Sequence, residues 1–161
     1  MDDKEISALV TLITNEIKDE LSLPKVSLKI ANKLIEAVIG EAERIGVKVV
    51  VAVSDASGVP VSVHRMDDAY IASYDIALNK SYTAVALKMP TSELKTLASP
   101  GGSLYGIQFT NNGKIVIFGG GEPLKNKNTI CGGLGVSGGT EEQDTYLSAY
   151  GAGFFEENFC G

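Results

Sequence analysis

The sequence predicts an α+β domain in which about five mostly antiparallel strands form one sheet covered by helices. Apolar residues recur at helical spacing in several segments, and β-branched runs are joined in pairs by short turns. The elements follow the order helix, helix, hairpin, helix, hairpin, strand, helix, which favours a layered α+β fold. A chain of 161 residues with 44% hydrophobic content can bury one sizeable core but not two. We therefore expect a single domain over residues 1–161.

Two amphipathic helices are expected at the N-terminal end. The first runs from about residue 3 to residue 21 and ends before Pro24. Ser27 is a suitable N-cap for the second helix, and Gly46 stops it. Because both helices carry an apolar stripe, both should pack against something. The stripe of the first helix consists of Ile6, Leu9, Val10, Ile13 and Ile17.

A β-hairpin is expected over residues 47–65. Its first strand, 47–53, is almost continuously apolar and should be central, whereas the second strand, 59–65, alternates. Residues 55–58 have the composition of a short turn. The alternation gives one face to Val59, Val61, Val63 and Arg65 and the other to Pro60, Ser62 and His64.

The rest of the chain predicts three more helices and a second hairpin. A third helix spans about residues 70–89, with Tyr74 expected in the core, and a short helix follows over 91–98. Asn112-Gly113 lies between two strand-like runs and indicates the second hairpin. A glycine-interrupted strand then precedes a helix that starts near Thr140, where Gln143 completes a capping box.

Composition excludes several classes of partner and site. The net charge of −6 disfavours nucleic acid and anionic membranes. No apolar run approaches a membrane span, and the acidic start MDDKEIS is unlike a secretory signal, so we expect a cytoplasmic protein. Cys131 and Cys160 lack the spacing of metal ligands and are interpreted as packing residues.

His64 is the only histidine and the first candidate for chemistry. It could be a solvated residue on a strand face, a base, or a metal ligand. A single histidine without suitably spaced partners does not build a zinc site. Haem requires less, because one axial ligand from a pocket can suffice. The sequence leaves the solvated residue and the haem ligand both open.

Three more side chains are candidates for ligand contacts. Arg65 could bind an anion such as a haem propionate or phosphate, or it could pair with Asp67. Lys80 on the third helix is either a solvated lysine or, if it turns inward, an anion contact. Tyr82 could line a flat apolar ligand, although tyrosines at helical spacing more often pack in a core.

The segment GGLGVSGGT, residues 132–140, could shape a site with its backbone. Its glycines precede a helix N-terminus, as in phosphate-binding loops, but the segment matches neither common nucleotide-binding motif and has no lysine. It also lacks the spacing of a serine nucleophile elbow. Gly135 and Ser137 are therefore candidate residues for ligand binding, not for catalysis.

Three separated motifs resemble those of the GlcG/HbpS family, which also occurs as the C-terminal domain of PduO-type corrinoid adenosyltransferases. They are SDASGVPVSVHRMDDA, IALNKSYTAVAL and GGLGVSGGTEEQD, in the order of the family, and the likeness covers roughly residues 27–156. Two departures are Ser81, where alanine is usual, and a glycine-rich region over 100–128. The matching positions are Asp55, Gly58, Arg65, Met66, Asp67, Ile76, Ala77, Lys80, Thr83, Ala84, Gly132, Gly135 to Thr140 and Asp144.

The resemblance implies a profilin-like fold, with a five-stranded antiparallel sheet between helices. It also implies homo-oligomers, often octamers, and haem binding in several members. The leading hypothesis is a haem- or tetrapyrrole-binding accessory protein, possibly tied to corrinoid or glycolate metabolism. His64 is then the axial ligand, and Arg65, Lys80, Tyr82, Gly135 and Ser137 form the rest of the site.

Two other readings remain. One is an assembly module without cofactor that forms an oligomer and serves a metabolic enzyme. The other, less supported, is an enzyme acting on a small carboxylate or a corrinoid, for which Asp67, Lys80 and Tyr82 offer functional groups but no recognised catalytic arrangement. A binding protein is therefore favoured over an enzyme.

Overall fold

The computed structural model describes residues 1–22 and 25–160 of the chain. Pro24, expected to end the first helix, lies outside the described residues. The elements in order are α1 (Asp3–Ser22), α2 (Leu28–Arg44), β1 (Val50–Asp55), β2 (Pro60–Arg65), α3 (Ala72–Ala86), α4 (Thr91–Ala98), two short 3-10 helices (Ile107–Phe109 and Asn111–Gly113), β3 (Gly121–Asn126), β4 (Thr129–Ser137) and α5 (Glu141–Phe159).

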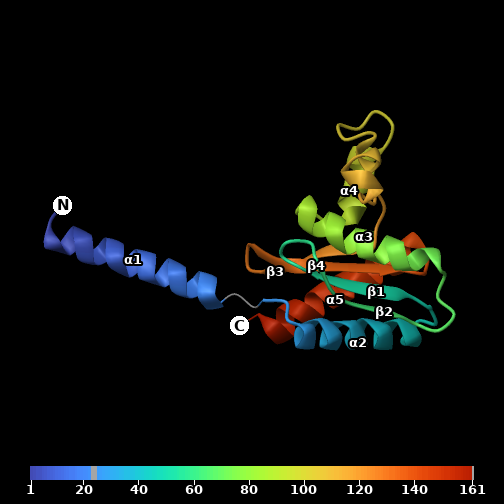
Figure 1. Ribbon diagram of the computed structural model, residues 1–161, viewed down its shortest axis with the longest axis horizontal. Coiled ribbons are helices and arrows are strands. Elements are labelled where there is room, and N and C mark those ends of the chain that lie inside the picture. The colour runs from blue at the N-terminus through green and yellow to red at the C-terminus, as the bar shows by residue number, and fades with distance from the viewer. Residues whose placement is uncertain (23–24, 161) are drawn as a thin grey trace.

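The sheet has four antiparallel strands in the order β2-β1-β4-β3, so β1 and β4 are central (Figure 1). The α+β class and the first hairpin are confirmed, but the prediction of five strands is wrong. No profilin-like arrangement of five strands is formed by the described residues. The second hairpin lies further along the chain than predicted, between β3 and β4, and turns at Lys127 with a positive φ of 54°.

The segment around Asn112-Gly113 does not form strands because its backbone curls. Asn111, Asn112 and Gly113 have φ values of 50°, 56° and 73°, three left-handed residues in a row. A two-residue hairpin turn needs only two such residues. The third turns the chain away from a partner strand, and the segment forms the short 3-10 helix Asn111–Gly113 instead.

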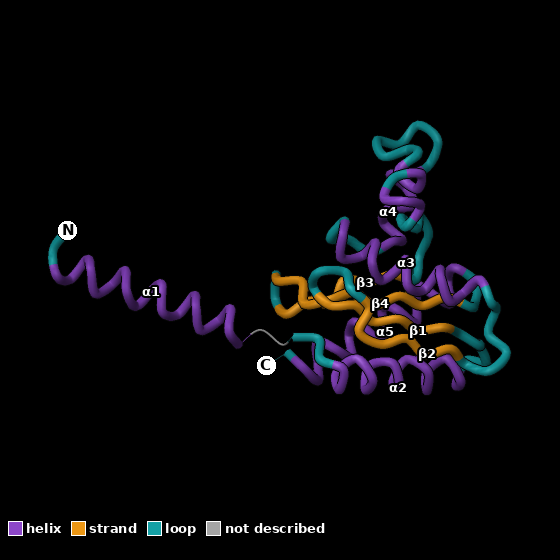
Figure 2. Tube along the Cα trace, in the orientation of Figure 1, coloured by secondary structure: helices purple, strands orange, loops and turns teal. Residues whose placement is uncertain are grey.

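Helices cover both faces of the sheet (Figure 2). The larger core lies between the sheet and helices α2 and α5, and it includes Leu34, Val51, Leu134 and Phe155. Helix α3 covers the opposite face over a smaller cluster of Val50, Ala52, Ala69 and Ala77. Small residues at this second interface let α3 approach the sheet closely.

Predicted helix ends are confirmed where the structure tests them. The Ser27 side chain accepts a hydrogen bond from the backbone N–H of Ile30, and Gly46 follows α2 with φ of 74°. Thr140 and Gln143 form the predicted capping box at the start of α5. These caps fix where α2 and α5 begin, and so fix which side chains face the sheet.

Helix α1 is the exception to the expectation that both N-terminal helices pack. It extends away from the sheet and the other helices (Figure 1), and every residue from 1 to 18 is exposed. Helix α2, in contrast, buries its apolar stripe against β1, β2 and α5. No helix in residues 1–22 and 25–160 is long and apolar enough to cross a membrane.

Candidate functional site

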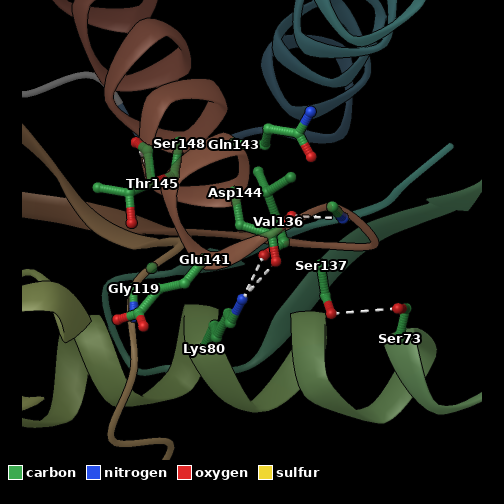
Figure 3. A network of polar contacts seen from close by, with 12 residues as sticks. Ser73, Lys80, Gly119, Val136, Ser137, Glu141, Gln143, Asp144, Thr145 and Ser148 are labelled. Carbon is green, nitrogen blue, oxygen red and sulfur yellow. Dashed lines mark hydrogen bonds and ion pairs between the residues drawn. The ribbon is translucent and has the colours of Figure 1, made fainter. Parts of the chain in front are cut away.

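A buried ion pair between α3 and α5 lies at the centre of the candidate site. Lys80 Nζ is 2.9 Å from Asp144 Oδ2 and donates a second hydrogen bond, 2.8 Å long, to the backbone oxygen of Val136. The Lys80 side chain is 0% exposed and that of Asp144 is 5% exposed. Figure 3 shows the lysine rising from α3 toward the first turn of α5. The anion that Lys80 contacts in this structure is therefore the Asp144 carboxylate.

Burial works against both charges of this pair. It lowers the pKa of Lys80, and the neighbouring Asp144 carboxylate opposes that change. Burial likewise raises the pKa of Asp144, which the Lys80 charge and hydrogen bonds from Lys80, Gly139 and Gly138 oppose. The Gly139 N–H donates to Asp144 Oδ1 at 2.9 Å. The carboxylate thus joins α3, α5 and the turn between β4 and α5.

Aromatic and backbone contacts surround the ion pair of Lys80 and Asp144. Lys80 Nζ lies 4.9 Å from the centroid of the Phe118 ring. The backbone N–H of Gly119 donates to Glu141 Oε1 at 3.0 Å, and Glu141 also pairs with Lys95 at the surface. The hydrogen bond from Lys95 lowers the pKa of Glu141. These contacts hold the segment before β3 over the ion pair.

A cavity of about 370 Å3 opens beside the pair. Its lining includes Ser73, Ile76, Phe118, Ser137 and Asp144. The Ser137 hydroxyl donates to the Ser73 hydroxyl at 3.2 Å (Figure 3). The cavity therefore combines two hydroxyls and a carboxylate with an aromatic and an aliphatic wall. Such a mixture can hold a small polar ligand or one edge of a larger flat one.

A second cavity of about 520 Å3 adjoins the first. The two share Tyr70, Gly138 and Gly139, and the second is further lined by Lys48 and Asp68. The end of the glycine-rich segment, Gly138 and Gly139, thus borders both cavities.

His64 and Arg65 project from β2 to opposite faces of the sheet. His64 pairs with Val51 and is half-buried on the α2 side, whereas Arg65 pairs with Val50 on the α3 side. The predicted separation of these two residues is therefore observed. Val61 departs from the alternation: a β-bulge leaves it unpaired, and it packs against the larger core.

Arg65 is held by backbone rather than by a carboxylate. Its Nε and Nη2 atoms donate to the Ala69 oxygen at 3.3 and 3.1 Å. The ion pair with Asp67, one of the two alternatives for Arg65, is not formed among the described residues. Beside this loop, Tyr70 and Ile71 are 74% and 88% exposed, and Tyr74 is also exposed. The prediction that Tyr74 lies in the core is wrong.

The other candidate residues are distributed along α3 and β4. Gly135 lies under α3, where an added Cβ would come within 2.0 Å of the Ala77 oxygen. Tyr82 lies at the other end of α3 from the cavities, against Gly58, and its hydroxyl accepts a hydrogen bond from Asn111 at 3.1 Å. The structure therefore brings Lys80 and Ser137 together but places His64, Arg65 and Tyr82 elsewhere.

Sequence reasoning missed Ser73, Phe118 and the role of Asp144. Asp144 was noted only as a motif position, yet a lysine buried on an inner helix face requires a carboxylate nearby. Phe118 and Ser73 had no signal, because their positions depend on how the chain returns to β3 and on the close packing of α3 against β4.

Residues 26–152 match the family model described as haem degrading protein HbpS-like. A 15.0 kDa protein from the dhaT-dhaS intergenic region of Citrobacter freundii is 46% identical over 132 residues, which are 82% of this chain and 93% of that protein. The corrinoid adenosyltransferase PduO of the same organism is 38% identical over 88% of this chain. That match spans only 41% of the adenosyltransferase.

Solved structures agree with this relationship. The Klebsiella pneumoniae protein ORFY superimposes with a TM-score of 0.79 at 42% identity, covering 81% of this chain and 90% of that one. A PduOC:heme complex gives 0.77 at 38% identity, covering 81% and 94%. A double mutant of HbpS from Streptomyces reticuli gives 0.74 at 30% identity, covering 81% and 87%.

Proposed function

Because the chain belongs to the HbpS-like family, we propose that it is an accessory protein that binds haem, with His64 as the axial ligand. The observation that carries the proposal is a half-exposed lone histidine on the edge strand β2, in a chain similar to a solved haem complex. Haem supplies an iron centre that a single imidazole can ligate.

The surroundings of His64 suit such a role. Among the described residues, the imidazole takes part in none of the hydrogen bonds and ion pairs, so a ring nitrogen is available to iron. Its neighbour on the same face, Ser62, is in contrast bonded to Asn32 at 2.7 Å. As the outermost strand, β2 leaves the imidazole reachable from the rim of the sheet.

Arg65 lies on the opposite face of the edge strand β2 from His64, so its guanidinium meets a haem propionate that reaches around the open edge of that strand. Its guanidinium uses Nε and Nη2 for the Ala69 oxygen, which leaves Nη1 free among the described residues to bind a carboxylate. We assign Lys80, Gly135 and Ser137 the role of holding α3 and β4 together.

A corrinoid is the alternative tetrapyrrole. It is suggested by the relation to PduO, although the match spans less than half of that enzyme. A corrinoid also carries a metal that an imidazole can ligate, so the same residue would serve either ligand. Titration with each compound separately distinguishes them.

The test is a haem titration of the purified protein followed by the Soret absorbance, with hydroxocobalamin titrated in parallel. His64→Ala should abolish saturable binding. Ser62→Ala is the matched control, because it removes a half-buried polar side chain from the same face of the same strand and keeps the imidazole. Arg65→Gln should weaken haem binding while leaving the spectrum of the bound form unchanged.

Each result leads to a different conclusion. Loss of binding in His64→Ala, but not in Ser62→Ala, supports the proposal. An unchanged Soret band in His64→Ala removes His64 from the role. If the parent protein binds neither haem nor hydroxocobalamin, an assembly module without cofactor becomes the better description.

A further inference from the structure

Helix α1 has an apolar stripe that nothing else in residues 1–22 and 25–160 covers. Its side chains Ile6, Leu9, Val10, Ile13 and Ile17 are each between 43% and 56% exposed. Helix α1 lies outside the region that matches the family model, residues 26–152, and extends away from it (Figure 1). Because helices in proteins are stabilised mainly by packing an amphipathic face, an unpacked stripe of this length indicates an absent partner.

The spacing of the stripe is that of a coiled coil. Ile6, Val10, Ile13 and Ile17 are separated by four, three and four residues, which are alternating d and a positions of a heptad. All four side chains are β-branched. Isoleucine at both a and d favours three or four parallel strands over two.

Charges on the two sides of the stripe are complementary. Glu5 and Glu16 lie on the side of the c and g positions, whereas Lys4 and Lys18 lie on the side of the b position. In a parallel bundle, the c and g side of one helix meets the b and e side of the next. Parallel copies therefore place acidic residues against basic ones, whereas antiparallel pairing places acidic flanks together.

The e positions strengthen the case for a second copy. They are occupied by Ser7 and Thr14, so no like charges oppose each other at the e positions, and acidic residues enter the seam only at its two ends, with Asp3 at a and Glu20 at d. An anionic membrane suits this helix less well, because Asp2, Asp3 and Glu5 outnumber Lys4 in its first turn and oppose acidic lipid.

We propose that α1 is a self-association helix whose stripe packs in parallel against α1 of other copies of this chain, forming a bundle of three or four helices. The interface is separate from the candidate ligand site and does not rest on haem binding. Two experiments on the full-length protein test it.

The first experiment compares Val10→Asp with Thr11→Asp by sedimentation equilibrium over a range of concentrations. Both variants replace an exposed β-branched residue of α1 by aspartate, but only Val10 lies in the seam. Val10→Asp should raise the concentration of half-assembly at least about 10-fold. Thr11→Asp should leave it within roughly 2-fold of the parent.

The second experiment compares Ile13→Cys with Asn15→Cys under mild oxidation. In a parallel bundle, equivalent d positions lie side by side, so Ile13→Cys should form interchain disulfides readily. Asn15 lies on the far side of the helix, and its variant should form few. Both variants retain Cys131 and Cys160, so any background from these thiols is the same.

Equal behaviour within either pair of variants overturns the proposal. A parent protein that stays monomeric also overturns it, and points instead to a different protein with an apolar groove as the occupant of the stripe. Because neither readout involves haem, failure here is distinguishable from failure of the proposed ligand.

Discussion

Lys80 Nζ lies 2.9 Å from Asp144 Oδ2, and this ion pair joins the helix on one face of the sheet to the first turn of the helix on the other. The two residues are 64 positions apart in the chain. The lysine also bonds the Val136 oxygen of the central strand β4, so the pair ties three layers at one point (Figure 3). Asp144 also lines one of the two adjoining cavities.

Removal of the lysine alone should be severe. Lys80→Met leaves the Asp144 carboxylate buried without its counter-charge, and breaking a buried pair in this way costs about 3–5 kcal/mol. Lys95→Met removes one member of a surface pair with Glu141 and should change stability little. Urea unfolding of both variants measures the difference.

The double variant Lys80→Met with Asp144→Leu should recover most of the loss. Replacement of a buried ion pair by apolar residues is often neutral or stabilising. If the double variant regains stability, the loss in Lys80→Met comes from the unpaired Asp144 charge and not from lost packing. If Lys80→Met proves no less stable than Lys95→Met, the pair is not the structural link described above.

Gly135→Ala should displace α3. An added Cβ would lie within 2.0 Å of the Ala77 oxygen, which is backbone and cannot rotate away. Overpacking of this kind costs about 1–3 kcal/mol or more. Gly153→Ala, on helix α5, meets nothing within 4 Å and should instead stabilise by about 0.5–1 kcal/mol, because glycine disfavours helix. Thermal unfolding of the two variants should therefore shift in opposite directions.

Loss of the cap on α5 should loosen the first turn that carries Asp144. Thr140→Ala removes the oxygen that accepts from the Gln143 N–H at 3.2 Å, at a cost of about 1 kcal/mol. Thr140→Ser keeps that oxygen and should retain most of the stability. Amide exchange of residues 141–144 measures the fraying locally. Equal exchange in both variants would contradict a role for the cap.

The elements whose signals are local were predicted from the sequence. Ser27, Gly46 and the Thr140–Gln143 box act within one turn of backbone, so their residue types alone fix the ends of α2 and α5. The prediction of a hairpin at Asn112-Gly113 was wrong because a hairpin depends on more than its turn residues. The dipeptide permits a tight turn, but neighbouring Asn111 adds another left-handed residue, and the flanking runs found no partner strand.

The candidate site depends on contacts between distant segments. The inward orientation of Lys80 follows from close packing of α3 on β4, which requires Gly135 beneath the helix. Alternation along β2 correctly separated His64 from Arg65, because a strand has a period of two. The same alternation could not show that Arg65 donates to the Ala69 oxygen instead of pairing with Asp67, because this choice depends on the path of the loop before α3.

Glu122 on the edge strand β3 should make stability fall as the pH rises. Burial, with a further contribution from the Glu93 charge, raises the pKa of Glu122 from its ordinary value of 4.5 to about 7. Below pH 4.5 the carboxyl is protonated in both folded and unfolded chains. Between pH 4.5 and 7 the unfolded chain releases this proton while the folded chain keeps it, so stability is lost across that window. Glu122→Gln should remove this part of the slope, and Glu93→Gln should reduce it. Urea midpoints of the three proteins at pH 5 and pH 8 measure the effect, and a parallel decline in parent and Glu122→Gln would contradict it.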